Sequence, residues 1–91
     1  MTTLILDFSS CKYIGELHAR IKETFGFPEY YGENLDALWD LLDNYDDCPI
    51  NVHIRGFNSL PNELYEYKMR LYRVFIRVSH TTPNISFAIE S

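Results

Sequence analysis

Apolar and polar residues follow two different periods along this chain, one typical of strands and one typical of helices. Three short runs, at residues 3–8, 50–55 and 85–89, are rich in aliphatic residues and have the length of β-strands. Between these runs, apolar residues recur every three or four positions, as on the buried face of a helix. Because helical sequence separates the strands, the sequence predicts an α/β fold with a small three-stranded, mainly parallel sheet packed with helices.

Three helical segments are predicted between the strands. The first begins at Gly15, the expected N-cap, and ends at Gly26. The second runs from its cap Asn34 to about Asn44. The third follows Pro61 and is one long helix or two abutting ones. With 91 residues and no linker or repeat, residues 1–91 are expected to form a single domain.

The strongest chemical signal is an acidic segment in and around the second predicted helix. Residues 29–47 hold seven of the thirteen acidic residues and no Lys or Arg. On a helix, Asp36, Asp40 and Asp43 share one face, and Trp39 lies at its border with the apolar face. Like charges at this spacing cost about 0.2–0.5 kcal/mol each, and anions near a helix C-terminus oppose the helix dipole. Because these acids destabilise the helix, we interpret them as a binding face for a basic partner. An ordinary solvated face is the alternative.

Net charge and hydropathy narrow the classes of partner. The net charge is -5 and the isoelectric point is about 5.0, whereas nucleic-acid phosphates are bound by basic surfaces. We therefore expect no direct contact with nucleic acid. No apolar run approaches the ~20 residues of a membrane span, and the N-terminus lacks a signal-peptide pattern. These patterns predict a cytoplasmic location and no membrane association.

No constellation of residues predicts catalysis, a metal or a cofactor. The three histidines lie far apart, without metal-binding spacing: His18, His53 and His80. The chain also lacks a nucleophile elbow and a Gly-rich phosphate loop. Asp36 and Asp40 could form a carboxylate pair for acid–base chemistry or metal binding, but a convex helix offers no enclosed cleft. The histidines are expected to be packed or surface residues.

Two further groups of residues have a structural interpretation. Cys11 and Cys48 are expected to be free thiols in a reducing compartment, with a disulfide between them as the alternative. A basic cluster lies on the third predicted helix, after its acidic first part: Lys68, Arg70, Arg73 and Arg77. This order of charges suits the helix dipole, so the cluster is interpreted as a solvated face.

Residues 28–40 carry a resemblance to a known family. They read Pro-Glu-Tyr-Tyr-Gly-Glu-Asn-Leu-Asp-Ala-Leu-Trp-Asp, an uninterrupted run that resembles the signature of the barstar family, bacterial inhibitors of barnase-type ribonucleases. Leu17-His18 and Val74-Phe75 match the family more weakly. The resemblance implies a barstar-like fold along nearly the whole chain.

The resemblance also implies a function. In the family, the second helix and the loop before it plug the active site of a ribonuclease, with no cofactor. It implies a 1:1 complex with a small basic ribonuclease, whose approach would be accelerated by electrostatic steering. The inhibitor itself is expected to be monomeric when free. The expected contacts, with Asp40 as the deepest anchor, are Tyr30, Gly32, Asn34, Asp36, Trp39 and Asp40. Asp43 and Tyr45 extend the acidic face and its aromatic border.

Two alternatives to inhibition remain, and the chain departs from the family pattern at two positions. The alternatives are an adaptor that docks a basic protein other than a nuclease and, more remotely, a small hydrolase. The family prototype has a further acidic contact in its last helix, where Arg77 stands in a simple alignment. Asp43 is acidic where the prototype is neutral, which shifts charge toward the end of the second helix.

Overall fold

The computed structural model describes residues 2–29, 31–44, 49–82 and 84–90, which form three strands and three α-helices. In chain order the elements are β1 (Thr2–Asp7), α1 (Ile14–Phe25), α2 (Leu35–Asp43), β2 (Ile50–Arg55), the 3-10 turns η1 (Phe57–Ser59) and η2 (Asn62–Leu64), α3 (Tyr65–Thr81) and β3 (Ile85–Ile89). The strands lie in the order β1-β2-β3, and both pairs are parallel. The predicted α/β fold is confirmed.

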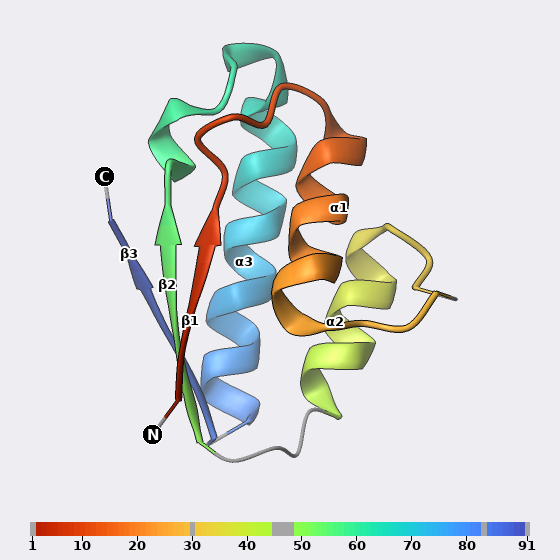
Figure 1. Ribbon diagram of the computed structural model, residues 1–91, viewed down its shortest axis with the longest axis vertical. Coiled ribbons are helices and arrows are strands. Elements are labelled where there is room, and N and C mark those ends of the chain that lie inside the picture. Colours follow the sequence, from red (N-terminus) through yellow and green to blue (C-terminus); the bar gives the residue numbers. More distant parts are fainter. Residues whose placement is uncertain (1, 30, 45–48, 83, 91) are drawn as a thin grey trace.

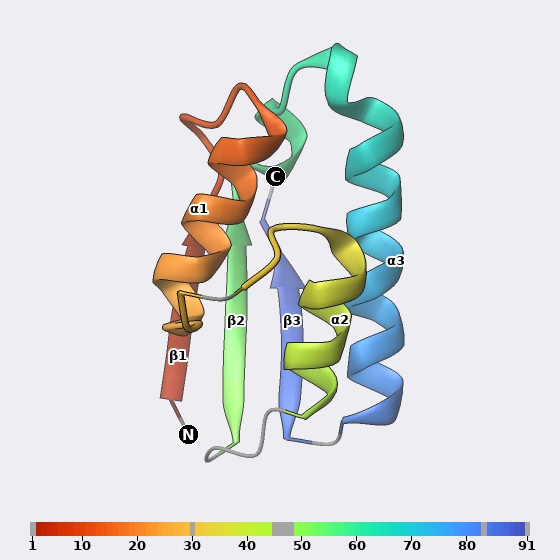
Figure 2. The same cartoon turned by 90° about the vertical axis from the view of Figure 1, so that its right-hand side faces the viewer.

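The sheet and the helices form two layers. All three helices lie on one face of the sheet, with α2 beside α3 (Figures 1 and 2). In parallel sheets the connections must cross over a face, and here every crossover uses the same one. The neighbour that α2 approaches most extensively is α3.

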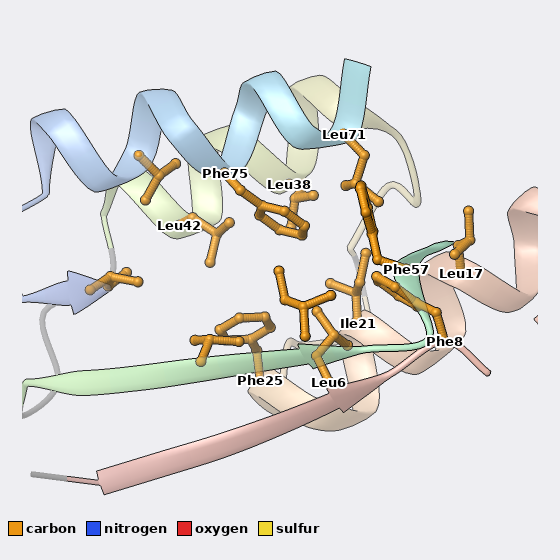
Figure 3. Packing of buried hydrophobic residues seen from close by; sticks show 14 of the residues in the cluster. Leu6, Phe8, Leu17, Ile21, Phe25, Leu38, Leu42, Phe57, Leu71 and Phe75 are labelled. Atoms are coloured by element: carbon orange, nitrogen blue, oxygen red, sulfur yellow. The ribbon is translucent and has the colours of Figure 1, made fainter. Parts of the chain in front are cut away.

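The apolar core fills the space between the layers (Figure 3). Alternate residues of β2 are buried, and each helix contributes one apolar stripe, as its period predicts. The residues with no exposed surface are Leu6, Phe8, Leu17, Ile21, Leu38, Leu42, Val52, Ile54, Leu71 and Val78, together with His18. Each buried aliphatic or aromatic side chain stabilises the fold by about 1.5–3 kcal/mol.

The outer face of the sheet is largely polar, with Ile5 exposed on it, and carries its own hydrogen-bond network. Asn51 Nδ2 lies 3.1 Å from His53 Nε2, and Arg55 Nε donates to Glu90 Oε2 at 3.0 Å. The hydrogen bond from Arg55 is the main cause that lowers the pKa of Glu90, and His53 also contacts this carboxylate. His53 lies on the less buried face of β2, in keeping with the expectation that the histidines are packed or surface residues. The network explains how a parallel sheet, usually covered on both faces, can leave one open.

Two helix boundaries differ from the sequence prediction. The N-cap of α1 is Tyr13 rather than Gly15, which lies inside the helix with open space around its Cα. The expected end is confirmed, since Gly26 is left-handed and its N–H donates to the carbonyl of Lys22. Pro61 precedes the turn η2, and a single helix, α3, follows from Tyr65. Both differences are local: α1 begins one residue before Gly15 without a side-chain cap, and a 3-10 turn precedes α3.

Cys11 is a buried free thiol, as expected, and Cys48 lies outside the described residues. Burial is the main cause that raises the pKa of the Cys11 thiol. No helix in the described part of the chain is long and apolar enough to cross a bilayer.

A pair of glycine substitutions tests the turn after β2. Gly56 has φ +69°, and a Cβ there would lie 2.5 Å from the backbone nitrogen of Ser9. We expect Gly56→Ala to lower the free energy of unfolding by at least about 2 kcal/mol, because the left-handed backbone and the clash with a fixed main chain add. Gly15→Ala is the matched control and should raise it by about 0.5 kcal/mol. Urea unfolding measures both; a loss of stability in Gly15→Ala would restore Gly15 as the cap.

Candidate protein-binding site

The loop before α2 is tied to the helix by one side chain. Asn34 Oδ1 accepts a hydrogen bond from the N–H of Ala37 at 2.8 Å, and its Nδ2 donates to the carbonyl of Gly32 at 3.1 Å. This confirms Asn34 as the N-cap. Between them, Glu33 adopts a left-handed conformation with φ 51°. The loop and the first turn of α2 thus form one connected unit.

The acidic face lies on the outside of α2. Asp36, Asp40 and Asp43 are exposed, whereas Leu38 and Leu42 are buried on the opposite side of the helix. Among the residues that the structure describes, none of the three carboxylates has a Lys, Arg or His partner within ion-pair distance. Their contacts are weak and polar: Asn44 Nδ2 lies 3.5 Å from Asp40 Oδ1, and Thr81 Oγ1 donates to Asp43 Oδ1 at 3.3 Å. The predicted arrangement of the three acids is confirmed.

The aromatic border of this face is described only in part. Trp39 is 37% exposed at the edge of α2, as the helical period predicts. Tyr30 and Tyr45, the other predicted aromatic contacts, lie outside the described residues. The structure thus brings together Gly32, Asn34, Asp36, Trp39, Asp40 and Asp43 on α2 and its preceding loop.

Sequence analysis named Arg73 and Arg77 as part of a solvated basic cluster, and Arg77 as the residue at a family contact position, but it did not place them beside this face. The guanidinium carbon of Arg77 lies 4.9 Å from the centroid of the Trp39 ring. A hollow of about 370 Å³ separates α2 from α3 here; it is lined by Leu35, Asp36, Trp39, Arg73, Val74 and Arg77. Arg73 and Arg77 are exposed, as a solvated helix face predicts, but they also border the acidic stripe. Their spacing of one turn places both on the same side of α3; only the packing of α3 against α2 shows what that side faces.

A buried histidine holds the loop to the rest of the fold. His18 on α1 has no exposed surface; its Nδ1 is hydrogen-bonded to the hydroxyl of Tyr31 and its Nε2 to that of Tyr67 on α3. A neutral imidazole has one donor and one acceptor nitrogen, so one hydroxyl donates to the ring and the other accepts from it. Burial lowers the pKa of His18, while the charge of Glu33 acts in the opposite direction. The link joins α1, the loop and α3 through one neutral side chain.

Within the described residues, no group of three or more His, Cys, Asp or Glu side chains could hold a metal ion. The comparisons with known proteins instead agree with the resemblance in residues 28–40. The family model described as "Barstar (barnase inhibitor)" matches residues 1–90. The chain belongs to the barstar family.

A curated relative of this barstar-family chain carries a related name. "Putative ribonuclease inhibitor YrdF" of Bacillus subtilis (strain 168) is 40% identical over 57 residues. The matched segment covers 63% of this chain and 63% of that protein, a little less than two thirds of its length. Both descriptions are of inhibitors, not of enzymes.

The buried imidazole predicts a pH dependence for this barstar-family protein. Because burial lowers the pKa of His18, the unfolded chain takes up a proton near pH 6.5 that the folded chain does not. Stability is then fully present above about pH 6.5 and falls as the pH is lowered, by at most about 1.4 kcal/mol per pH unit. Urea unfolding at pH 7 and pH 5 measures this fall. In His18→Gln, whose amide can still donate and accept, the fall should be smaller; an unchanged fall would show that His18 is not its source.

The acids of α2 predict a second effect on the stability of the free protein. Asp40 has like charges on both sides, and Asp43 lies in the last turn of the helix. We expect Asp40→Asn and Asp43→Asn each to raise the free energy of unfolding by about 0.3–1 kcal/mol, because repulsion is relieved and an amide oxygen can still accept from Thr81. Asp36→Asn, in the first turn, should be neutral or slightly destabilising. Urea unfolding at low and high salt measures all three; a less stable Asp40→Asn would mean that the acids hold the fold.

Proposed function

We propose that this protein inhibits a small basic ribonuclease by placing the acidic face of α2, and the loop before it, in the active site of the enzyme. The proposed complex is 1:1, formed by a protein that is monomeric when free, and its proposed location is the cytoplasm, where an inhibitor protects cellular RNA. The observation that carries the proposal is the row of exposed carboxylates without a cationic partner among the described residues.

The chemistry of the acidic face suits such an active site. A ribonuclease binds and cleaves a phosphodiester with Arg, Lys and His side chains, which are left unpaired when no RNA is bound. Carboxylates are strong acceptors for these donors, and they can bind Arg through two parallel hydrogen bonds. Asp40 lies between Asp36 and Asp43 in the middle of the face, so it is the proposed central anchor.

The rigidity of the site supports the same proposal. Asn34 caps α2, and Leu38 and Leu42 fix it to the core, so the carboxylates are held in place before binding. Such preorganisation lowers the entropic cost of association. Trp39 adds a large aromatic surface with few rotatable bonds at the edge of the acids. The proposed contact set is Tyr30, Gly32, Asn34, Asp36, Trp39, Asp40, Asp43 and Tyr45.

Titration of ribonuclease activity tests the proposal. The wild-type protein should inhibit barnase, or a ribonuclease recovered on the immobilised protein from the source culture, with a 1:1 end point. Asp40→Ala should weaken inhibition about 30-fold or more, because buried cations of the enzyme lose their partner at about 2 kcal/mol or more. Glu63→Ala makes the same change of charge at an exposed residue outside α2 and should inhibit like the wild type.

The association rate tests the role of charge in binding, and inhibition distinguishes the proposed function from the adaptor. The rate should fall steeply between low and physiological salt, because exposed charges are screened beyond ~8–10 Å. Equal inhibition by Asp40→Ala and the wild type would contradict the proposed use of α2. A protein that binds a basic partner tightly but inhibits no ribonuclease would be the adaptor.

A further inference from the structure

The hollow between α2 and α3 adds positive charge to an otherwise acidic surface. Arg73 and Arg77 on α3 face Asp36 and Trp39 on α2 across about 370 Å³, and Figure 2 shows the two helices side by side. At roughly 30 Å³ per water molecule, this hollow holds on the order of ten waters. A side chain from a partner can therefore enter it without a rearrangement of the helices.

The geometry of Arg77 leaves its donors available. Its guanidinium carbon is 4.9 Å from the ring centroid of Trp39, within the range of a cation–π contact. Arg77 makes no ion pair among the described residues, so its N–H groups can bind a carboxylate through two parallel bonds. Trp39 thus holds the cation beside the hollow through a contact that involves no carboxylate.

Neither arginine is neutralised within the part of the chain that the structure describes. The ion pairs found there join Lys22 to Glu29, and His53 and Arg55 to Glu90. Asp36 lines the same hollow, yet it makes no ion pair with Arg73 or Arg77. Each guanidinium carries five N–H donors. Two such groups at one opening present N–H donors that no carboxylate of the described residues pairs with.

We propose that this hollow receives an Asp or Glu side chain of the inhibited ribonuclease, and that Arg73 and Arg77 determine which ribonuclease is accepted. The inference rests on the proposed function, since the hollow adjoins the acidic face of α2. A nucleic-acid phosphate fits less well, because the neighbouring carboxylates repel a polyanion. A single carboxylate at the edge of a basic active site suits this surface better. The carboxylate would face the two arginines, and the basic residues around it would face the acids of α2.

The same arginines exclude other ribonucleases. An enzyme with Lys or Arg at the corresponding position would place two cations together, and a like-charge contact at an interface counts against the wrong partner. The acids of α2 then provide attraction to any basic active site, while the hollow discriminates between enzymes. Specificity of this kind needs both an attractive and a repulsive element, and here they lie on adjacent helices.

Charge reversal at Arg77 tests the inference. The probe is the ribonuclease that the immobilised wild-type protein retains and inhibits. Arg77→Glu should raise its dissociation constant at least tenfold more than Arg70→Glu does. Arg70 lies on the same helix and its reversal changes the net charge equally, but it does not line the hollow. The difference should appear mainly in the dissociation rate.

A second set of variants separates binding from a structural role of Arg77. Arg77→Gln loses the charge without adding repulsion to Asp36 and should weaken inhibition less than Arg77→Glu; it also serves where Arg77→Glu does not fold. Acidic residues at the rim of the ribonuclease are then reversed to Lys one at a time. One of these reversals should weaken the wild-type complex and restore binding to Arg77→Glu, which a merely structural role would not produce.

The outcomes for the two proposals are distinct. If Asp40→Ala loses inhibition while Arg77→Glu binds as tightly as Arg70→Glu, the proposed function stands and this inference is wrong. The absence of any compensating reversal in the ribonuclease also overturns it. A wild-type protein that inhibits no ribonuclease removes the proposed function, and this inference with it.

Discussion

The hydrogen bonds between His18 and the hydroxyls of Tyr31 and Tyr67 are the constraint on which the candidate site depends. They join α1, α3 and the loop that leads into α2. These segments are otherwise held by apolar packing, which has little directionality, and by the exposed ion pair between Lys22 of α1 and Glu29 of the loop. An imidazole buried without partners would cost on the order of 1–3 kcal/mol for each unsatisfied nitrogen. With both nitrogens paired, that penalty is largely offset, and the geometry of the bonds fixes where the loop runs. The loop in turn delivers Asn34 to the start of α2.

The acidic helix α2 is stable because the rest of the fold packs against it. A helix of nine residues is too short to form alone in water, and its like charges oppose it further. The burial of Leu38 and Leu42 against α3 and the core, together with the Asn34 cap, more than balances these local costs. The acidic residues on the outer face therefore do not account for the stability of the helix. A surface that is locally unfavourable, yet held rigidly, is what a preorganised binding face requires.

The sequence predicts the fold well wherever one element carries its own signal. The apolar stripes of α1 and α3, the alternation in β2 and the Asn34 cap all depend on neighbours within a few residues, and they are confirmed. It fails where the deciding contact is remote. Tyr31 and Tyr67 lie 13 and 49 residues from His18, and no local period relates them. The predicted start of α1 was wrong for a local reason. Tyr13 is the N-cap without a side-chain hydrogen bond, so no residue type in the sequence marks the position.

Because α2 packs beside α3, the candidate site contains both negative and positive charges. On α2, the apolar stripe is buried in the core, so the exposed acidic face is the part available to a partner. On α3, Arg73 and Arg77 face the hollow beside Leu35 and Trp39, so the packing of the two helices places two cations at the edge of the acids of α2. Because the two charges come from different helices, Arg73 and Arg77 can be substituted without altering the Asn34 cap or the acids of α2. The two proposals are therefore physically separable: the proposed attraction to a basic active site depends on α2, and the proposed choice between enzymes depends on α3.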